Sequence, residues 1–250
     1  MPQIAAGGIK IAYLDEGVGD PVLLIHGFAS SKEVNWVNTG WVDSLVKAGR
    51  RAIAFDNRGH GASSKLYDPE DYRLEEMAAD AIAVLDHVGV PEADVIGYSM
   101  GGRIAATLAL DHAFRVRSAI IGGLGTALVD SWDAADRIVA GLEAPSLDAV
   151  TDEIGRMFRK FAEQTRSDLA ALAACMRMGR QTIAPERLVG VTVPVLIAAG
   201  TRDTMSGSPR GLAALIPGAE VLDIPGRDHM LAVGDKAFKA GALDFLDRRP

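Results

Sequence analysis

A serine stands at a glycine-flanked corner of the sequence, in the segment GYSMG, where Ser99 lies two residues after Gly97 and two before Gly101. The segment follows an apolar, strand-like run and precedes a run rich in alanine and leucine that favours a helix. A serine at the apex of such a turn adopts a strained backbone, and a Cβ atom at either flanking position would clash with neighbouring chain. The N-terminus of the following helix favours an oxyanion. The chemistry indicated is nucleophilic attack by a serine hydroxyl.

The elements that must position Ser99 alternate between short apolar runs and amphipathic helical patterns. The runs are continuous and rich in β-branched residues, which is typical of strands buried on both faces of a parallel sheet. After a predicted hairpin around Gly7 and Gly8, they lie at residues 22–25, 51–56, 93–99, 116–123, 193–200 and 219–226. The clearest helical pattern runs from Leu74 to Val88 and is predicted to stop at Gly89. This alternation predicts an α/β fold with helices on both faces of the sheet.

One region departs from this alternation, because the sequence from about Leu128 to Leu188 contains helical patterns and no strand-like run. We interpret residues 128–188 as a helical cap insertion within a single domain, whose core comprises residues 1–127 and 189–250. The insertion offers five apolar candidates for pocket walls, although such residues more often pack helices together: Met157, Phe158, Phe161, Leu172 and Met176. Four charged residues between them predict an ordinary solvated face: Arg156, Arg159, Lys160 and Glu163.

Further segments accompany GYSMG in a fixed order: LLIHGF at 23–28, DNRGHGASS at 56–64, GTRD at 200–203 and GRDHM at 226–230. With these motifs the sequence resembles the α/β-hydrolase fold superfamily over nearly its whole length, and in particular its serine esterase and lipase-like branch. The resemblance implies a mostly parallel eight-stranded sheet flanked by helices, with a small helical cap. It also implies a catalytic triad in the chain order serine, acid, histidine, which falls on Ser99, Asp203 and His229.

Each residue type in this triad has a defined chemical role. A serine hydroxyl is a weak nucleophile until a neutral imidazole takes its proton, and a carboxylate on the other ring nitrogen fixes the tautomer and stabilises the imidazolium. Asp203 and His229 each follow a predicted strand, so both should reach the C-terminal edge of the sheet, where such folds bind ligands. Asp130 is the alternative acid, and Asp228 is expected to be solvated or to bond its own loop.

The resemblance further implies an oxyanion hole made by the backbone N–H groups of Phe28 and Met100, with the Phe28 ring available to line the acyl pocket. The loop has the sequence HGF and not HGGG, which separates the chain from the hormone-sensitive-lipase-like branch and argues against that branch's long, bulky acyl substrates. The dehalogenases and epoxide hydrolases of the family attack with an aspartate, so the serine at position 99 argues against both activities.

The remaining histidines and the single cysteine have structural interpretations. His26 and His60 belong to segments in which the family uses histidines to hold loops, His87 and His112 end predicted helices, and Cys175 is expected to pack within the insertion. One cysteine excludes an intrachain disulfide and a cysteine-based zinc site. The sequence contains no phosphate-loop, zincin or dinucleotide-binding motif, so neither a metal nor a cofactor is expected.

The chain of 250 residues carries a formal charge of −7, and 48% of its residues are hydrophobic, which is sufficient for a buried core. It has no block rich in lysine and arginine, so nucleic acid is not an expected partner. Its first residues lack the features of a signal peptide, and no apolar run approaches the roughly 20 residues that cross a bilayer. We therefore expect a cytoplasmic protein without a membrane span, while the charge pattern leaves the oligomeric state open.

These observations favour a serine hydrolase, resembling carboxylesterases, that cleaves a small-to-medium carboxylic ester through an acyl-enzyme intermediate. The same triad also performs hydrolysis of a carbon–carbon bond in a diketone, lactone opening and perhydrolysis with peroxide, and the sequence does not separate these reactions from ester cleavage. A different alternative is a ligand sensor on the hydrolase fold that turns over slowly and uses the insertion as a partner surface. The charged residues of the insertion argue against such a surface.

Overall fold

The computed structural model describes residues 2–131, 134–178 and 181–248. Its centre is an eight-stranded sheet with the strand order β1-β2-β4-β3-β5-β6-β7-β8. The strands are β1 (Gln3–Ala6), β2 (Ile9–Glu16), β3 (Asp20–Ile25), β4 (Arg50–Phe55), β5 (Ala93–Tyr98), β6 (Val116–Gly122), β7 (Val195–Gly200) and β8 (Glu220–Ile224). Strand β2 is antiparallel to β1 and β4, and the other neighbours are parallel. The mostly parallel sheet predicted from the sequence is confirmed.

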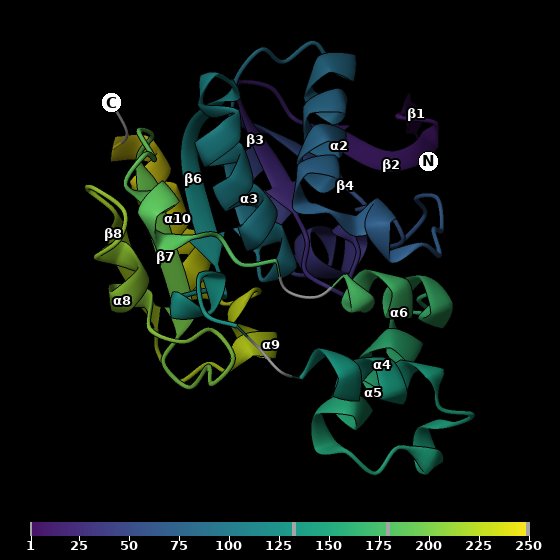
Figure 1. Ribbon diagram of the computed structural model, residues 1–250. Helices are drawn as coiled ribbons and strands as arrows, with labels where there is room; N and C mark the ends of the chain where they lie inside the picture. The colour runs from purple at the N-terminus through teal and green to yellow at the C-terminus, as the bar shows by residue number, and fades with distance from the viewer. Residues whose placement is uncertain (1, 132–133, 179–180, 249–250) are drawn as a thin grey trace.

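Helices cover both faces of the sheet because the central strands are apolar on both faces. In β3, Leu23 and Ile25 belong to one buried cluster, while Val22 and Leu24 belong to the other. The first face is covered by α2 (Leu74–His87), α3 (Met100–Asp111) and α8 (Pro209–Ala213), and the second by α1 (Trp41–Lys47) and α10 (Lys236–Arg248). Figure 1 shows α2 and α3 in front of the sheet and α10 behind it.

Helix α2 ends where the sequence predicts a stop. Its last residue is His87, and Gly89 follows with φ +68°. Glycine adopts this left-handed conformation without the steric cost that a side chain adds, so it ends a helix efficiently. Other single-turn elements join the larger ones: Glu33–Val37, Pro69–Tyr72, Ala113–Arg115, Thr126–Leu128 and Leu147–Ala149.

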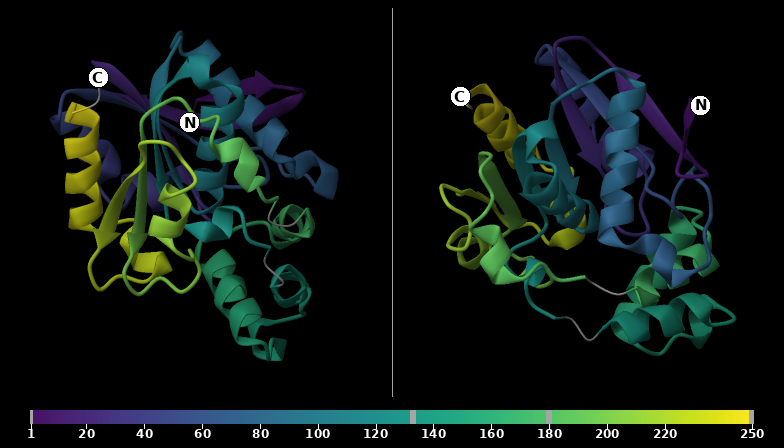
Figure 2. Two further views of the ribbon diagram at one scale, coloured as in Figure 1. Left: turned by 60° about the vertical axis from the view of Figure 1, so that its left-hand side comes forward. Right: turned by 45° about the horizontal axis from the view of Figure 1, so that its top comes forward.

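Four helices lie between β6 and β7, within the predicted insertion. They are α4 (Ala135–Glu143), α5 (Glu153–Gln164), α6 (Leu169–Arg177) and α7 (Pro185–Leu188). The insertion also includes residues 132–133 and 179–180, which lie outside the described residues. Figures 1 and 2 show α4, α5 and α6 grouped together beyond one end of the sheet. Asp152 and Asp168 cap α5 and α6, because each carboxylate accepts a hydrogen bond from a first-turn amide.

One prediction for the insertion is wrong. The side chain of Arg159 is not on a solvated face, since the residue is only 6% exposed, whereas Arg156, Lys160 and Glu163 are exposed. Arg159 Nη1 donates to three backbone carbonyls at the C-terminal end of α4, and its Nε donates to Glu163. The guanidinium thus satisfies carbonyl groups that have no partner within α4 and lies at the negative end of that helix dipole.

Across the described ranges, no helix combines the length and the apolar character that crossing a membrane requires.

Candidate active site

Ser99 occupies the turn between β5 and α3 in a strained conformation, with φ +53° and ψ −112°. A non-glycine residue rarely adopts positive φ, and such strain persists only where the surroundings fix it. The Ser99 amide donates to the carbonyl of Gly122 in the neighbouring strand β6 at 2.8 Å. This bond and the start of α3 at Met100 hold the hydroxyl at the carboxyl end of the sheet.

The two glycines beside Ser99 lie where backbone segments nearly touch. A Cβ atom on Gly97 would lie 2.0 Å from the carbonyl oxygen of Gly101, and one on Gly101 would lie 2.0 Å from the carbonyl oxygen of Ile25. Both neighbours are backbone atoms, so a rotamer change cannot relieve the contact. The close approach expected from the GYSMG pattern is therefore present on both sides of the turn.

The structure brings Ser99, Asp203 and His229 into one chain of hydrogen bonds. His229 Nε2 lies 3.0 Å from Ser99 Oγ, and His229 Nδ1 lies 2.8 Å from Asp203 Oδ2. Asp203 follows β7, and His229 opens the short helix α9 (His229–Ala232) after β8. The alternative acid Asp130 forms no described bond to the histidine. Asp228 accepts hydrogen bonds from the first amides of α9, as expected for a loop-bonding carboxylate.

Asp203 is held as a carboxylate. Its side chain is fully buried, which alone would raise its pKa, but hydrogen bonding and attraction to His229, together with hydrogen bonds from the Met205 and Ser206 amides, keep the pKa below its ordinary value. The two amides donate to Oδ1 at 2.8 and 3.0 Å, which leaves Oδ2 for the imidazole. An ionised, oriented carboxylate at Nδ1 places the proton there and leaves Nε2 free to accept.

Tyr98 contacts both the backbone and the ring of His229 and was not identified from the sequence. Its hydroxyl donates to the backbone carbonyl of His229 at 2.6 Å, and the two rings lie 5.6 Å apart between centroids. Burial raises the pKa of Tyr98 well above its ordinary value, so the phenol remains a donor. The sequence feature that could have identified Tyr98 is its position in GYSMG, directly before Ser99.

Two backbone amides beside Ser99 are available to a ligand. Met100 is the first residue of α3, and such amides have no acceptor within their own helix. The Phe28 amide likewise donates to no acceptor among the described residues. The loop is fixed just after it: Ala29 is fully buried with φ +56°, and its carbonyl accepts a hydrogen bond from Thr165 Oγ1 at 2.9 Å. Thr165, which follows α5, thus holds the loop that presents Phe28.

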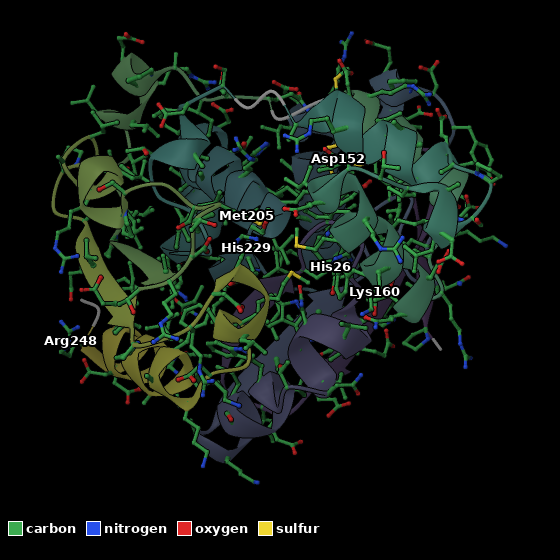
Figure 3. All side chains as sticks on the ribbon, turned by 90° about the horizontal axis from the view of Figure 1, so that it is seen from below. His26, Asp152, Lys160, Met205, His229 and Arg248 are labelled. Carbon is green, nitrogen blue, oxygen red and sulfur yellow. The ribbon has the colours of Figure 1, made fainter. Side chains whose placement is uncertain are left out.

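The serine hydroxyl opens into a cavity of about 200 Å³, lined both by residues of the segment 128–188 and by residues outside it. Figure 3 shows His229 near the centre of this end of the molecule, with Asp152 and Lys160 on the neighbouring cap helix. Three of the predicted wall residues, Phe158, Phe161 and Met176, line the cavity. Leu172 is instead fully buried in the cap's own core, and Met157 is 37% exposed. The core supplies apolar walls that the sequence did not indicate: Val34, Leu74, Met77, Leu124 and Val233.

His26 and His60 hold loops, as predicted. His26 Nε2 accepts from the Asn57 amide at 3.0 Å, while His26 Nδ1 and His60 Nδ1 each lie 2.8 Å from a backbone carbonyl. Burial lowers the pKa of both residues, that of His60 to about 3. Cys175 does not pack only within the insertion as expected, because it is buried against Tyr72 and Met100 of the remaining chain and borders the cavity; burial raises its pKa to about 12. A thiol with this pKa is a poor nucleophile near neutral pH.

The described residues contain no group of three or more histidine, cysteine, aspartate or glutamate side chains placed to hold a metal ion. The groups that the structure places around Ser99 are an imidazole, a buried carboxylate and two free amides. Such a set performs acyl transfer to serine.

The fold and this arrangement define a hydrolase-type α/β protein, and comparison with known families agrees. The model of the alpha/beta hydrolase fold family matches residues 20–176. The chain belongs to this family.

Individual relatives are similar over different lengths. Rhodomycin D methylesterase of Streptomyces peucetius is 31% identical, with 92% of this chain and 93% of the relative aligned. The 3-oxoadipate enol-lactonase 2 of Acinetobacter baylyi is 30% identical over 62% of each chain. For several curated relatives, the aligned part spans only 21% to 62% of their length. The solved enol-lactonase of Burkholderia xenovorans shares the fold, with a TM-score of 0.80 at 23% identity over 99% of this chain and all of the other.

Proposed function

We propose that this protein is a serine hydrolase that cleaves carboxylic esters through an acyl-enzyme intermediate. The observation that carries the proposal is the unbroken path of hydrogen bonds from Ser99 Oγ through His229 to the buried Asp203. A serine in such a path is activated for attack, and the strained turn exposes its hydroxyl to the cavity.

In the first half of the reaction, Ser99 Oγ attacks the ester carbonyl carbon while His229 Nε2 accepts the hydroxyl proton. Asp203 stabilises the imidazolium, and the amides of Phe28 and Met100 donate to the oxyanion of the tetrahedral intermediate. When the intermediate collapses, the carbon–oxygen bond to the alcohol breaks and His229 returns the proton to the departing alkoxide. The alcohol leaves, and the acyl group remains on Ser99.

In the second half, a water molecule replaces the alcohol. His229 Nε2 accepts a proton from the water as its oxygen attacks the acyl carbonyl, and the same two amides hold the new oxyanion. Collapse breaks the bond to Ser99 Oγ, which takes back the proton. The carboxylic acid leaves, and the enzyme returns to its starting state.

The walls of the cavity support a small-to-medium substrate. The cavity is mostly apolar and measures about 200 Å³, and residues 128–188 act in this proposal as a cap that supplies Phe158, Phe161 and Met176 to its wall. The similarity to a methylesterase and an enol-lactonase supports an ester or lactone as the substrate. Carbon–carbon hydrolysis and perhydrolysis use the same groups, and no contact in the cavity favours them.

The proposal is tested with p-nitrophenyl esters from acetyl to decanoyl, on the wild type, Ser99→Ala and the control Ser146→Ala. Ser146 is exposed and its side chain caps no helix. We expect sustained turnover that is lost in Ser99→Ala and retained in Ser146→Ala, with the preferred chain length reporting the size of the cavity. Undiminished turnover in Ser99→Ala would contradict the proposal, and a single-turnover burst in the wild type would favour a slow sensor.

A further inference from the structure

Four arginines in the described part of the chain are almost completely buried, and three of them face a carboxylate. The three pairs, each with an N···O distance of 2.7 Å, are Arg50 with Asp247, Arg58 with Asp80 and Arg159 with Glu163. Such pairing is expected, because a buried guanidinium without a counter-charge is energetically costly. The fourth arginine, Arg103, differs from the other three.

Arg103 is 4% exposed and forms no ion pair with any described carboxylate. Its Nη1 donates to the carbonyls of Leu128 and Gln181 at 3.3 and 3.1 Å, and its Nη2 donates to the carbonyl of Ala127. A guanidinium has five N–H donors, and Arg103 Nε–H has no acceptor among the described residues. Burial lowers the pKa of Arg103 to about 10, which is the effect of desolvation without a compensating negative charge.

Arg103 brings this uncompensated positive charge to the wall of the active-site cavity. The residue lines the same cavity as Ser99, and among the described residues no other lysine or arginine and no aspartate or glutamate does so. Four residues separate Arg103 from Ser99 along α3, so its Cα lies about 6 Å further along the helix. The walls nearby include apolar side chains of Leu74, Met77 and Leu124. A ligand that reaches from Ser99 past these walls meets the positive charge of Arg103.

We propose that the substrate carries a carboxylate in addition to its ester group, and that Arg103 binds this carboxylate. The inference rests on the proposed function and adds the class of substrate to it. The free donors of the guanidinium match the geometry of a carboxylate, and the low polarity of the surrounding apolar walls strengthens their interaction. The three carbonyl contacts hold the guanidinium in place before the ligand arrives, so little side-chain freedom is lost on binding.

The test compares two pairs of esters that differ only in the charge of a carboxyl group. The first pair, p-nitrophenyl hydrogen glutarate and its methyl ester, places the carboxylate on the acyl side. The second pair, 4-acetoxybenzoate and its methyl ester, places it on the alcohol side. The ratio of kcat/KM within each pair is measured for the wild type, Arg103→Met and Arg248→Met. Arg248 lies on α10, far from His229 in Figure 3, so its loss is a matched change in total charge.

We expect the wild type and Arg248→Met to prefer the anionic member of at least one pair by about tenfold or more, and Arg103→Met to lose that preference. The ratio within a pair is unaffected by a general loss of activity. A preference for the neutral member of both pairs in the wild type, or an unchanged ratio in Arg103→Met, would overturn the inference. Failure of the proposed function would look different, because the neutral esters would then show no turnover dependent on Ser99.

A second measurement needs no variant. Glutarate and its uncharged diamide are compared as competitive inhibitors of wild-type turnover of p-nitrophenyl acetate. We expect glutarate to inhibit at a concentration about tenfold lower than the diamide. Equal inhibition by the two compounds would overturn the inference even if Arg103→Met failed to fold.

Discussion

His229 Nε2 lies 3.0 Å from Ser99 Oγ, although 130 residues separate the two along the chain. The contact exists because both residues follow parallel strands whose carboxyl ends share one edge of the sheet. Ser99 follows β5, and His229 follows β8 at the start of α9. The parallel topology therefore assembles the proposed reacting groups, and the loops after the strands only adjust their distances.

Replacing Asp203 by asparagine tests the orientation of the imidazole. The amide keeps the size of the carboxylate but removes its charge and stabilises the wrong histidine tautomer. We expect kcat for a p-nitrophenyl ester to fall by about 10³ to 10⁴, with KM changed little. Asp130→Asn is the matched control and should retain activity. Equal activity in the wild type and Asp203→Asn would show that another group orients His229.

A methyl group at Gly101 tests the packing of the turn. The added Cβ would lie 2.0 Å from the carbonyl oxygen of Ile25, so β3 or α3 must move. We expect Gly101→Ala to lower the free energy of unfolding by about 3 kcal/mol or more, measured by urea denaturation. Gly190→Ala is the control, since its Cβ would meet only the Arg187 carbonyl oxygen at 3.2 Å. Similar stabilities for the two variants would refute the argument from close approach.

The buried His60 predicts how stability depends on pH. Its pKa is ordinarily 6.5, and burial lowers it to about 3 in the folded protein, where its Nε2 has no described partner. Between these values the unfolded chain binds a proton that the native state does not. The free energy of unfolding therefore falls as the pH is lowered through this range, by at most about 1.4 kcal/mol per pH unit.

Urea unfolding between pH 7 and pH 5 measures this slope. We expect His60→Gln to show a flatter dependence than the wild type, whatever its absolute stability. His87→Gln removes an exposed histidine and should keep the wild-type slope. If His60→Gln and the wild type shared one slope, His60 would not be the source of the pH dependence.

The bond between the cap and the loop of Phe28 can be tested at Thr165. Its hydroxyl donates to the carbonyl of Ala29 at 2.9 Å and also lies within hydrogen-bond distance of carbonyls in its own helix. We expect Thr165→Val to lower kcat about tenfold with little change in KM, because a displaced Phe28 amide weakens the oxyanion contact. Thr165→Ser should restore the wild-type kcat. A loss confined to KM would indicate a role in substrate binding instead.

The sequence was sufficient to predict the strands and the residues that follow them. Continuous apolar runs such as 93–99 are constrained by burial on both faces, so their composition reveals them. The crowding at Gly97 and Gly101 was predictable for a similar reason, because the turn between strand and helix is local. These features depend on contacts within a few residues or on the regular geometry of the sheet.

The walls of the cavity were harder to predict. Leu172 and Phe158 both belong to apolar patterns of the insertion, yet only Phe158 reaches the cavity. The difference depends on how the cap helices pack against one another and against the core. The burial of Arg159 and of Arg103 was hard to predict for the same reason. The backbone carbonyls that each guanidinium contacts lie in other segments of the chain. A charged residue in a helical pattern is ordinarily exposed, and only the assembled structure shows the exception.

The central claim is that Ser99 is the nucleophile, and covalent trapping tests it most directly. A fluorophosphonate phosphonylates an activated serine: Oγ attacks phosphorus, His229 accepts the hydroxyl proton, and the P–F bond breaks as fluoride leaves. Intact mass and peptide mapping are followed together with residual turnover of p-nitrophenyl acetate. We predict a single adduct on Ser99 that forms in parallel with the loss of turnover and is absent in His229→Ala. Full inactivation without an adduct on Ser99, or continued turnover by fully labelled protein, would contradict the proposal.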